Sequence, residues 1–283
     1  MTVTLWGTRG SLASPGAETA RYGGNTSCVE VGDSNGSVLV LDAGTGIRRL
    51  GTSLPRNLRR VDILLTHLHM YHIQGLGFFA PLYDPAVAVH IWGPASTTVS
   101  LRARLMRYLS PPLFPVHLRD LPCCLEVHEV PCGDFEVGPF HISCALVCHP
   151  GPTVGYRIAT AGAVLAYIPD HEPALGNRAF PPSADWTSGY QTAAGADLLI
   201  HDAQYSLEEY AAHVGWGHCG IEDALAFAQL ARVKHLVPFH HDPAHSDDDL
   251  DRLLVAATAA ARPAFSVTPG TEGHTFKLGN SAQ

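Results

Sequence analysis

The hydrophobic positions of the chain first form a series of short runs. Each run has the length and the apolar or alternating pattern of a strand, and each closes at Gly, Asn, Asp or Pro. We expect these runs to pair as a meander, because no helix-length pattern alternates with them as it does in nucleotide-binding folds. The predicted strands are residues 3–7, 27–32, 37–44, 61–67 and 88–93.

Helical spacing of apolar positions begins in residues 96–110 and stops at the Pro-Pro pair of 111 and 112. More strands and then helices follow along the chain. We predict strands at 125–130, 135–149, 153–160, 163–170 and 197–205, helices at 206–214 and 221–233, a strand at 235–241 and a helix at 247–261. This order predicts an α+β fold, a single domain over residues 1–283 in which two sheets pack face to face with helices outside.

Composition narrows the classes of partner. The formal charge of −8, from 18 Lys+Arg and 26 Asp+Glu, provides no basic face for a DNA duplex. No segment approaches the roughly 18 consecutive apolar residues of a membrane span, and the amino terminus lacks a signal-peptide pattern. The seven cysteines include no C-x-x-C pair, and we interpret them as reduced, mostly buried thiols of a cytoplasmic protein.

Histidines and carboxylates gather where the predicted strands end. His67 and His69 lie on one face of an extended stretch, and His72 comes from the turn that follows. Strand ends hold side chains in fixed positions, and imidazole and carboxylate are ligands of divalent metals. The sequence therefore predicts a metal site built from several strand ends. The further candidates at strand ends are His149, Asp170, His201, Asp202, His240 and His241.

The stretch Thr66–Gly75 resembles a family motif, T-H-x-H-x-D-H-x-x-G, with Tyr71 in place of the Asp. On this motif the chain resembles the metallo-β-lactamase fold hydrolases. The segments WGTRGS, RYGGNTSCVEV, LDAGTGIRRLG, HPGPTVGYRI, YIPDHE, LIHDAQY, GWGH and FHHDP are similar to the phosphodiesterase-like branch, which includes ribonuclease Z and cyclic phosphate phosphodiesterases. The resemblance covers nearly the whole chain. It implies a four-layer αβ/βα sandwich of two mostly antiparallel sheets with helices outside.

The resemblance also implies roles for individual residues. One or two ions are expected, with zinc favoured and manganese or iron as alternatives. His218 matches a histidine near the leaving group, where it would donate a proton, and His201 and Asp202 would orient ligands. Asp42 would do the same or turn the chain. The implied metal ligands are His67, His69 and His149 for the first ion, Asp170 as the bridge, and His72 with His240 for the second. The implied catalytic residues are Asp170, His218 and Tyr71.

Tyr71 leaves three interpretations open, because the Asp that it replaces is a ligand of the second metal in the family. Loss of that charge weakens or empties the second site, so that one ion activates water. Alternatively, the phenol ionises and binds a hard ion such as iron. In the third interpretation Tyr71 points away, and the chain binds a ligand without turning it over.

The substrate is the least constrained part of the prediction. Residues 76–85 and 107–120 are rich in aromatic residues and proline and suggest an apolar lid or pocket wall. Four arginines are candidates for a clamp on a phosphate or a carboxylate, or for ordinary ion pairs: Arg9, Arg21, Arg48 and Arg157. We predict a metal-dependent phosphodiesterase acting on a small phosphodiester, and by analogy with fold relatives a homodimer. The alternatives are hydrolysis of lactones or thioesters, and a regulatory protein that only binds.

Overall fold

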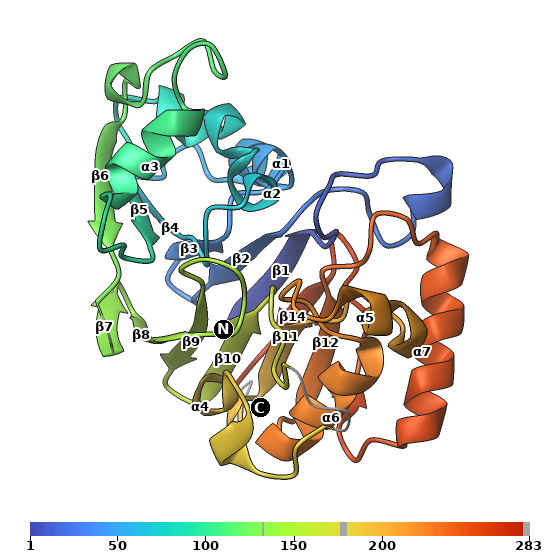
Figure 1. Cartoon of the computed structure of the whole chain (residues 1–283). Helices are drawn as coiled ribbons and strands as arrows, with labels where there is room; N and C mark the ends of the chain where they lie inside the picture. Colours follow the sequence, from blue (N-terminus) through green and yellow to red (C-terminus); the bar gives the residue numbers. More distant parts are fainter. Residues whose placement is uncertain (132, 176–179, 280–283) are drawn as a thin grey trace.

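Two sheets packed face to face form the centre of the molecule, and helices cover both outer faces (Figure 1). The computed structural model describes residues 1–131, 133–175 and 180–279. In this part of the chain each sheet has seven strands. The first has the order β14 (Thr275–Lys277), β1 (Thr2–Gly7), β2 (Cys28–Gly32), β3 (Val38–Leu41), β4 (Arg60–Leu64), β5 (Ala88–Gly93) and β6 (Cys124–Glu129). The second has the order β13 (Ser266–Val267), β12 (His235–Phe239), β11 (Leu198–Asp202), β10 (Ala163–Ile168), β9 (Val154–Thr160), β8 (Phe140–Leu146) and β7 (Gly133–Val137).

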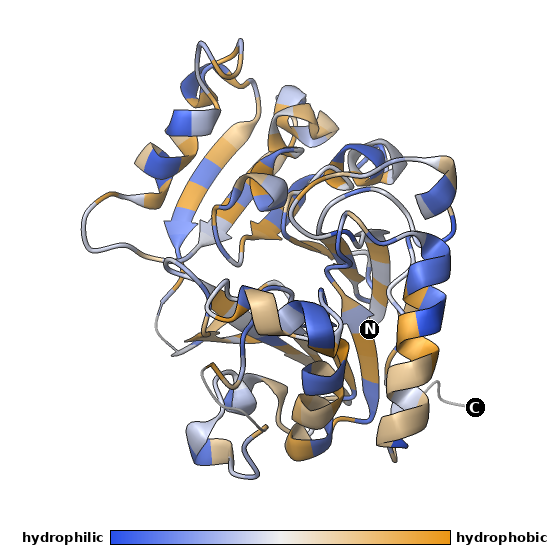
Figure 2. Cartoon of the chain, turned by 45° about the vertical axis from the view of Figure 1, so that its right-hand side comes forward, coloured by the Kyte–Doolittle hydropathy of each residue, from blue (hydrophilic) through white to orange (hydrophobic). Residues whose placement is uncertain are grey.

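Helices give each sheet an outer apolar layer. On the first sheet these are α1 (Ile47–Ser53), α2 (Met70–Ile73) and α3 (Leu101–Tyr108), and on the second α4 (Tyr190–Ala193), α6 (Ile221–Ala231) and α7 (Asp247–Ala261). Helix α5 (Leu207–His213) has no buried residue and takes no part in this layer. One core lies between the sheets, and one lies beneath each helical layer. Figure 2 shows α7 with hydrophilic residues in its first turns and hydrophobic residues further along. The predicted sandwich with helices outside is thus confirmed.

The meander predicted for the early strands is confirmed for β1, β2 and β3 and wrong from β3 to β6, where neighbouring strands are parallel. Parallel neighbours need a crossover connection. Helix α1 supplies one between β3 and β4, in a short segment for which the hydrophobic pattern predicts no helix. Each described sheet is therefore mixed, with one antiparallel and one parallel half.

Element ends follow from local signals. The predicted strand 135–149 is split into β7 and β8, because Gly138 has a φ of 53° and turns the chain between them. The helix predicted at 96–110 begins only at Leu101, since the Ser100 side chain caps it. Helix α7 spans the predicted range and opens with a capping box formed by Ser246 and Asp249.

Three further predictions have different outcomes. Cys28, Cys123 and Cys219 are buried, whereas Cys144 and Cys148 are half-buried and Cys124 is exposed, so the expectation of mostly buried thiols holds for only half of the described cysteines. Cys132 lies outside the described residues. Within the described residues, every helix is too short or too polar to cross a membrane. The single domain over residues 1–283 stays a prediction.

Candidate metal centre

The predicted ligands meet because their strands end at the same edge of the sandwich. Strands β10, β11 and β12 run parallel, so that Asp170 and His240, which follow β10 and β12, lie close together. His67 and His69 follow β4 of the facing sheet. The remaining two, His72 and His149, come from α2 and from the loop after β8.

Four side chains form the first ligand group: His67, His69, His149 and Asp170, whose ligand atoms all lie within 4.8 Å of one another. His149 Nε2 lies 3.2 Å from His69 Nδ1. Asp170 Oδ2 lies 3.7 Å from His67 Nε2 and 3.8 Å from His149 Nε2. Three nitrogens and one carboxylate oxygen around a common point match the ligand set of a zinc ion.

A second group shares the carboxylate of Asp170. His72 Nε2 lies 2.8 Å from Asp170 Oδ1, and His240 Nε2 lies 3.3 Å from Asp170 Oδ2. All three side chains are fully buried. The structure therefore brings together all six residues predicted as ligands, with Asp170 at the position expected of a bridge; their role as ligands stays a prediction.

The donor atoms of this cluster fit divalent metal ions. Within the described structure, the Nε2 atoms of His67 and His240 are buried without a hydrogen-bond partner, and that of His72 meets the carboxylate of Asp170. Each of the rings that present Nε2 to the cluster is fixed through Nδ1 by a protein group, which is how metal-binding histidines are usually oriented. The contacts are His72 to Asp42 Oδ2 at 2.8 Å, His67 to Thr66 Oγ1 at 3.1 Å, His149 to Gly217 O at 2.7 Å and His240 to Gln204 Oε1 at 3.1 Å.

Electrostatics also favour a cation here. Burial alone would raise the pKa of Asp170, but the histidines around it, His240 first, hold that pKa well below its usual value. Burial would lower the pKa of His72, but the carboxylates of Asp170 and Asp42 outweigh burial and raise it to about 10. The pKa of His149 falls to about 4 through burial, which keeps its ring in the neutral form that binds metal.

Asp42 contacts the second group through the Nδ1 atom of His72. It has a φ of 57°, and its carboxylate accepts hydrogen bonds from the Thr66 backbone and hydroxyl and from the Tyr167 hydroxyl, besides its contact with His72. A non-glycine residue held in this left-handed conformation stores strain, which is common at functional sites.

Replacing Asp42 with asparagine is expected to weaken binding of the ion nearest His72 by about 10- to 100-fold, because His72 loses an anionic partner. Zinc titration against a chromophoric chelator measures this affinity. Asp33→Asn, which changes an acidic residue of a surface turn, is the control. Equal affinity in the wild-type protein and Asp42→Asn would contradict the assigned role.

The phenol of Tyr71 points into the ligand cluster. Its hydroxyl donates to Asp170 Oδ2 at 3.1 Å and lies 3.1 Å from His69 Nδ1. The interpretation in which Tyr71 points away is therefore wrong. Burial, followed by the charge of Asp170, raises the pKa of this phenol, so the neutral hydroxyl is the favoured form.

His218 lines the open side of the cluster although it is buried. Its Nδ1 lies 2.7 Å from Asp202 Oδ2, and burial raises the pKa of Asp202 to about 6 despite this contact. Asp202 thus orients His218, and its Oδ2 also lies 4.0 Å from Nδ1 of the predicted ligand His240. His201 turns away from the cluster, since its Nε2 contacts His171 Nδ1 at 2.8 Å.

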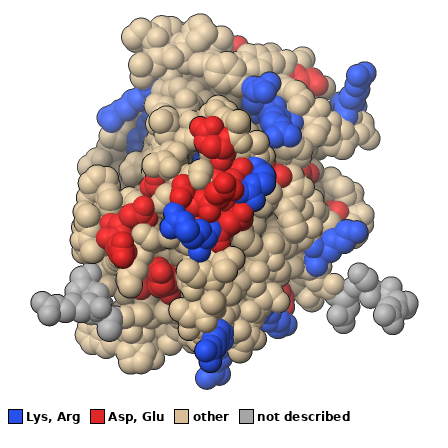
Figure 3. Space-filling view, turned by 90° about the vertical axis from the view of Figure 1, so that its right-hand side faces the viewer, with Lys and Arg blue, Asp and Glu red and all other residues tan. Residues whose placement is uncertain are grey.

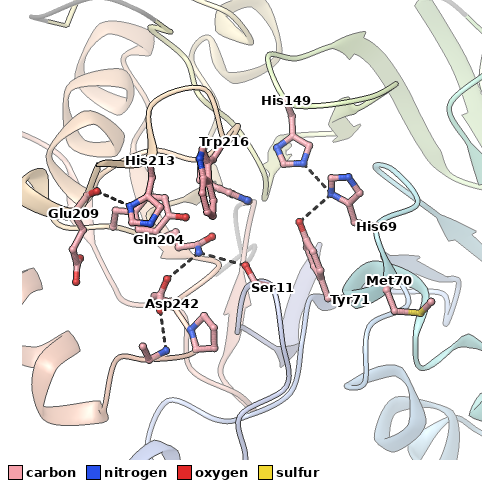
Figure 4. A pocket seen from close by; sticks show the side chains of 14 residues that line it. Ser11, His69, Met70, Tyr71, His149, Gln204, Glu209, His213, Trp216 and Asp242 are labelled. Atoms are coloured by element: carbon pink, nitrogen blue, oxygen red, sulfur yellow. Dashed lines mark hydrogen bonds between the residues drawn. The ribbon is translucent and has the colours of Figure 1, made fainter. Parts of the chain in front are cut away.

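A pocket of about 740 Å³ opens onto the cluster (Figure 4). His69, Tyr71 and His149 contribute to its wall, and Figure 4 shows Trp216 and His213 on the side opposite Met70. The sequence pattern gave no role to most of the wall. The residues it missed are Ser11, Gln204, Tyr205, Glu209, His213, Trp216, Asp242, Pro243 and Ala244.

None of the four candidate arginines lines this pocket. Arg9 is fully buried and donates to backbone carbonyls, Arg157 likewise donates to carbonyls, and Arg48 is exposed. Arg21 pairs with Asp248 and Asp251 of α7, on a face where Figure 3 shows acidic and basic side chains together. The four arginines therefore form no phosphate clamp at this pocket, and Arg9, Arg21 and Arg157 make ordinary structural contacts instead.

The predicted apolar wall lies beside the pocket. Residues of the segments 76–85 and 107–120, among them Phe78 and Leu113, line a separate hollow of about 680 Å³. Met70 lines both hollows and is 48% exposed. These segments therefore border the predicted site through Met70.

Fold and site together define a metal-dependent hydrolase, and comparison with known proteins gives the family. The beta-lactamase superfamily domain matches residues 38–241. The ribonuclease Z of Mycobacterium bovis (strain BCG / Pasteur 1173P2) is 30% identical over 271 residues, covering 86% of each chain. The chain belongs to the metallo-β-lactamase superfamily, in the phosphodiesterase-like branch.

Solved structures agree on the fold. The short form of human tRNase Z is 22% identical, with a TM-score of 0.69 over 99% of this chain and 100% of that one. A zinc-bound PqqB from Methylobacterium extorquens is 20% identical, with a TM-score of 0.70 over 98% of this chain and 100% of that one. The fold implies divalent metal ions, and the cluster described above has the donors to hold them.

Proposed function

We propose that this metallo-hydrolase cleaves a small phosphodiester with zinc held by the six clustered ligands. The observation that carries the proposal is the charge of the pocket: of the described residues that line it, none is Lys or Arg. The negative charge of a substrate must therefore be balanced by the metal centre and the histidines. A phosphodiester, with a single negative charge, suits this wall better than a phosphomonoester or a polyphosphate.

Two features of the wall strengthen this choice. Glu209 and Asp242 line the pocket and would repel additional negative charge. The volume of about 740 Å³ lies within the range of roughly 300–1,000 Å³ that small-molecule sites occupy. Zinc is the proposed ion because nitrogen donors dominate the cluster, and a zinc-bound neighbour shares the fold.

The side chains at the site have different roles in the proposed hydrolysis. A divalent ion bound here lowers the pKa of water and offsets charge on the phosphoryl oxygens. Asp202 fixes the Nδ1 side of His218, which leaves Nε2 to donate a proton to the leaving oxygen. Tyr71 holds Asp170 through its hydroxyl and occupies space where the family has a ligand. We propose that the second ion is consequently held more weakly than the first.

Hydrolysis of bis(p-nitrophenyl) phosphate tests the proposal. Turnover is expected to stop with a chelator, to return with zinc, and to exceed turnover of the monoester p-nitrophenyl phosphate. Absence of chelator-sensitive turnover with zinc, manganese and iron would overturn the enzymatic proposal. More efficient cleavage of a transfer RNA precursor than of any small diester would overturn the proposed substrate size.

Trp216 provides an aromatic surface for a substrate base. It lies at the pocket, is 61% exposed, and meets the His213 ring edge to face with centroids 4.8 Å apart. Stacking of a base on an aromatic side chain contributes about 1–3 kcal/mol. Trp216→Ala is therefore expected to raise KM for a cyclic nucleotide by about fivefold or more.

The same variant should leave KM for a diester with two alkyl groups nearly unchanged. Trp186, which is also exposed but does not line the pocket, gives the control Trp186→Ala. A similar rise in KM for both substrates, or for both variants, would contradict a stacking role.

A further inference from the structure

A second set of metal-binding side chains lies on the edge of the first sheet, outside the pocket. His90 of β5 pairs with Glu126 of β6, and His128 lies two residues further along β6. Side chains two residues apart on a strand share a face, so the three side chains project from the same side of the sheet. Strand β6 ends the sheet order, which leaves this group at an edge.

The ligand atoms lie close to the spacing of a metal site. His90 Nδ1 and His128 Nε2 are 3.0 Å apart, and Glu126 Oε2 lies 3.7 Å from the first and 3.5 Å from the second. Ligands bound to one tetrahedral zinc ion at about 2.0–2.2 Å are separated from each other by roughly 3.3–3.5 Å. The three atoms thus approximate one face of a zinc coordination tetrahedron.

Neighbouring side chains hold the imidazole rings of His90 and His128, and one side of the three-residue group is open to solvent. Trp92 stacks on His128 with ring centroids 4.1 Å apart, and the His90 and His128 rings are within 6° of parallel. The nearby cation of Arg60 is engaged by Asp62 through two hydrogen bonds of 2.8 Å. The Glu126 side chain is 54% exposed, so water can reach a fourth coordination position.

We infer that His90, Glu126 and His128 form a zinc site, separate from the catalytic centre, that joins edge strand β6 to β5. The ion would neutralise Glu126 and hold the two strands together through side chains, in addition to their backbone pairing. Because metal that binds the folded chain stabilises it, the site would strengthen strand β6, which among the described strands has a neighbour on one side only.

Zinc counting tests this site without reference to activity. The full chain is equilibrated at a fixed, low-micromolar free zinc concentration, and bound zinc is measured by elemental analysis. His128→Gln is expected to hold one zinc ion fewer per chain than wild type, with unchanged hydrolysis of bis(p-nitrophenyl) phosphate. Equal zinc content in the two proteins overturns the inference.

Two further variants make the test specific. Glu126→Gln alters an exposed side chain and is expected to raise the zinc concentration for half-saturation of this site by more than about tenfold. Removing the hydrogen-bond partner of a ligand already weakens metal binding by about 10- to 100-fold, and removing the ligand itself costs more affinity. Cys124 is an exposed thiol two residues before Glu126, so Cys124→Ser is the control and should keep the additional ion. Loss of the ion in Cys124→Ser, or an unchanged titration in Glu126→Gln, overturns the assignment. Melting curves in excess chelator check that every variant folds.

Discussion

Replacing Asp170 with asparagine is expected to release at least one metal ion and to lower kcat/KM for a phosphodiester by about 10³-fold or more. The two oxygens of this buried carboxylate face both ligand groups. Asparagine keeps the shape but removes the negative charge that would balance the bound metal ions. A loss of about 4 kcal/mol of transition-state stabilisation corresponds to the expected factor. Elemental analysis and kinetics on the same preparation measure both effects.

Glu209→Gln is the matched control for Asp170→Asn. It also removes one negative charge from a residue at the pocket, but its contacts are with Ser206 and His245 rather than with a predicted ligand. This variant should retain the full metal content. If Asp170→Asn keeps both its metal and its turnover, Asp170 is not the bridge between the two groups.

Much of the fold could be predicted because local signals and tertiary packing agree. Apolar runs mark the strands, and the Ser-x-x-Asp sequence at Ser246 marks the start of α7. The parallel half of the first sheet could not be predicted in the same way. Helix α1, with the sequence IRRLGTS, buries only Ile47 and Leu50, so its hydrophobic pattern is too weak to indicate the crossover that makes β3 and β4 parallel.

The candidate site likewise has a part that could be predicted from the sequence and a part that could not. Histidines of one motif, such as His67 and His69, are recognisable because their spacing fixes which way they point from an extended chain. Contacts between segments that are distant in the sequence could not be predicted, because no local sequence pattern indicates them. The partner of His218 is Asp202, not a metal ligand, and Gln204 orients His240 across 36 positions. Trp216 and the rest of the pocket wall come from separate loops that only the fold brings together.

Tyr71→Asp is expected to tighten binding of the second ion by at least about tenfold, or about 1.4 kcal/mol. Tyr71 Oη already lies 3.1 Å from both Asp170 Oδ2 and His69 Nδ1, so the side chain at this position reaches the cluster. An aspartate restores the negative charge and the ligand oxygen of the family motif and vacates the space of the ring. Zinc titration with elemental analysis should show the second ion bound at lower zinc concentration than in wild type. Unchanged metal content and affinity would mean that Tyr71 does not weaken the second site.

Tyr71→Phe distinguishes the effect of the missing carboxylate charge from the effect of the tyrosine side chain that stands in its place. Phenylalanine retains the ring and removes only the hydroxyl that donates to Asp170. If the missing carboxylate is the cause of weak binding, Tyr71→Phe should hold the second ion no more tightly than wild type, and only Tyr71→Asp should gain affinity. If both variants gain equally, the hydrogen bond from the phenol to Asp170 is what competes with the ion. In that case the tyrosine controls the second site by occupying the bridging carboxylate, and the absence of a ligand is secondary.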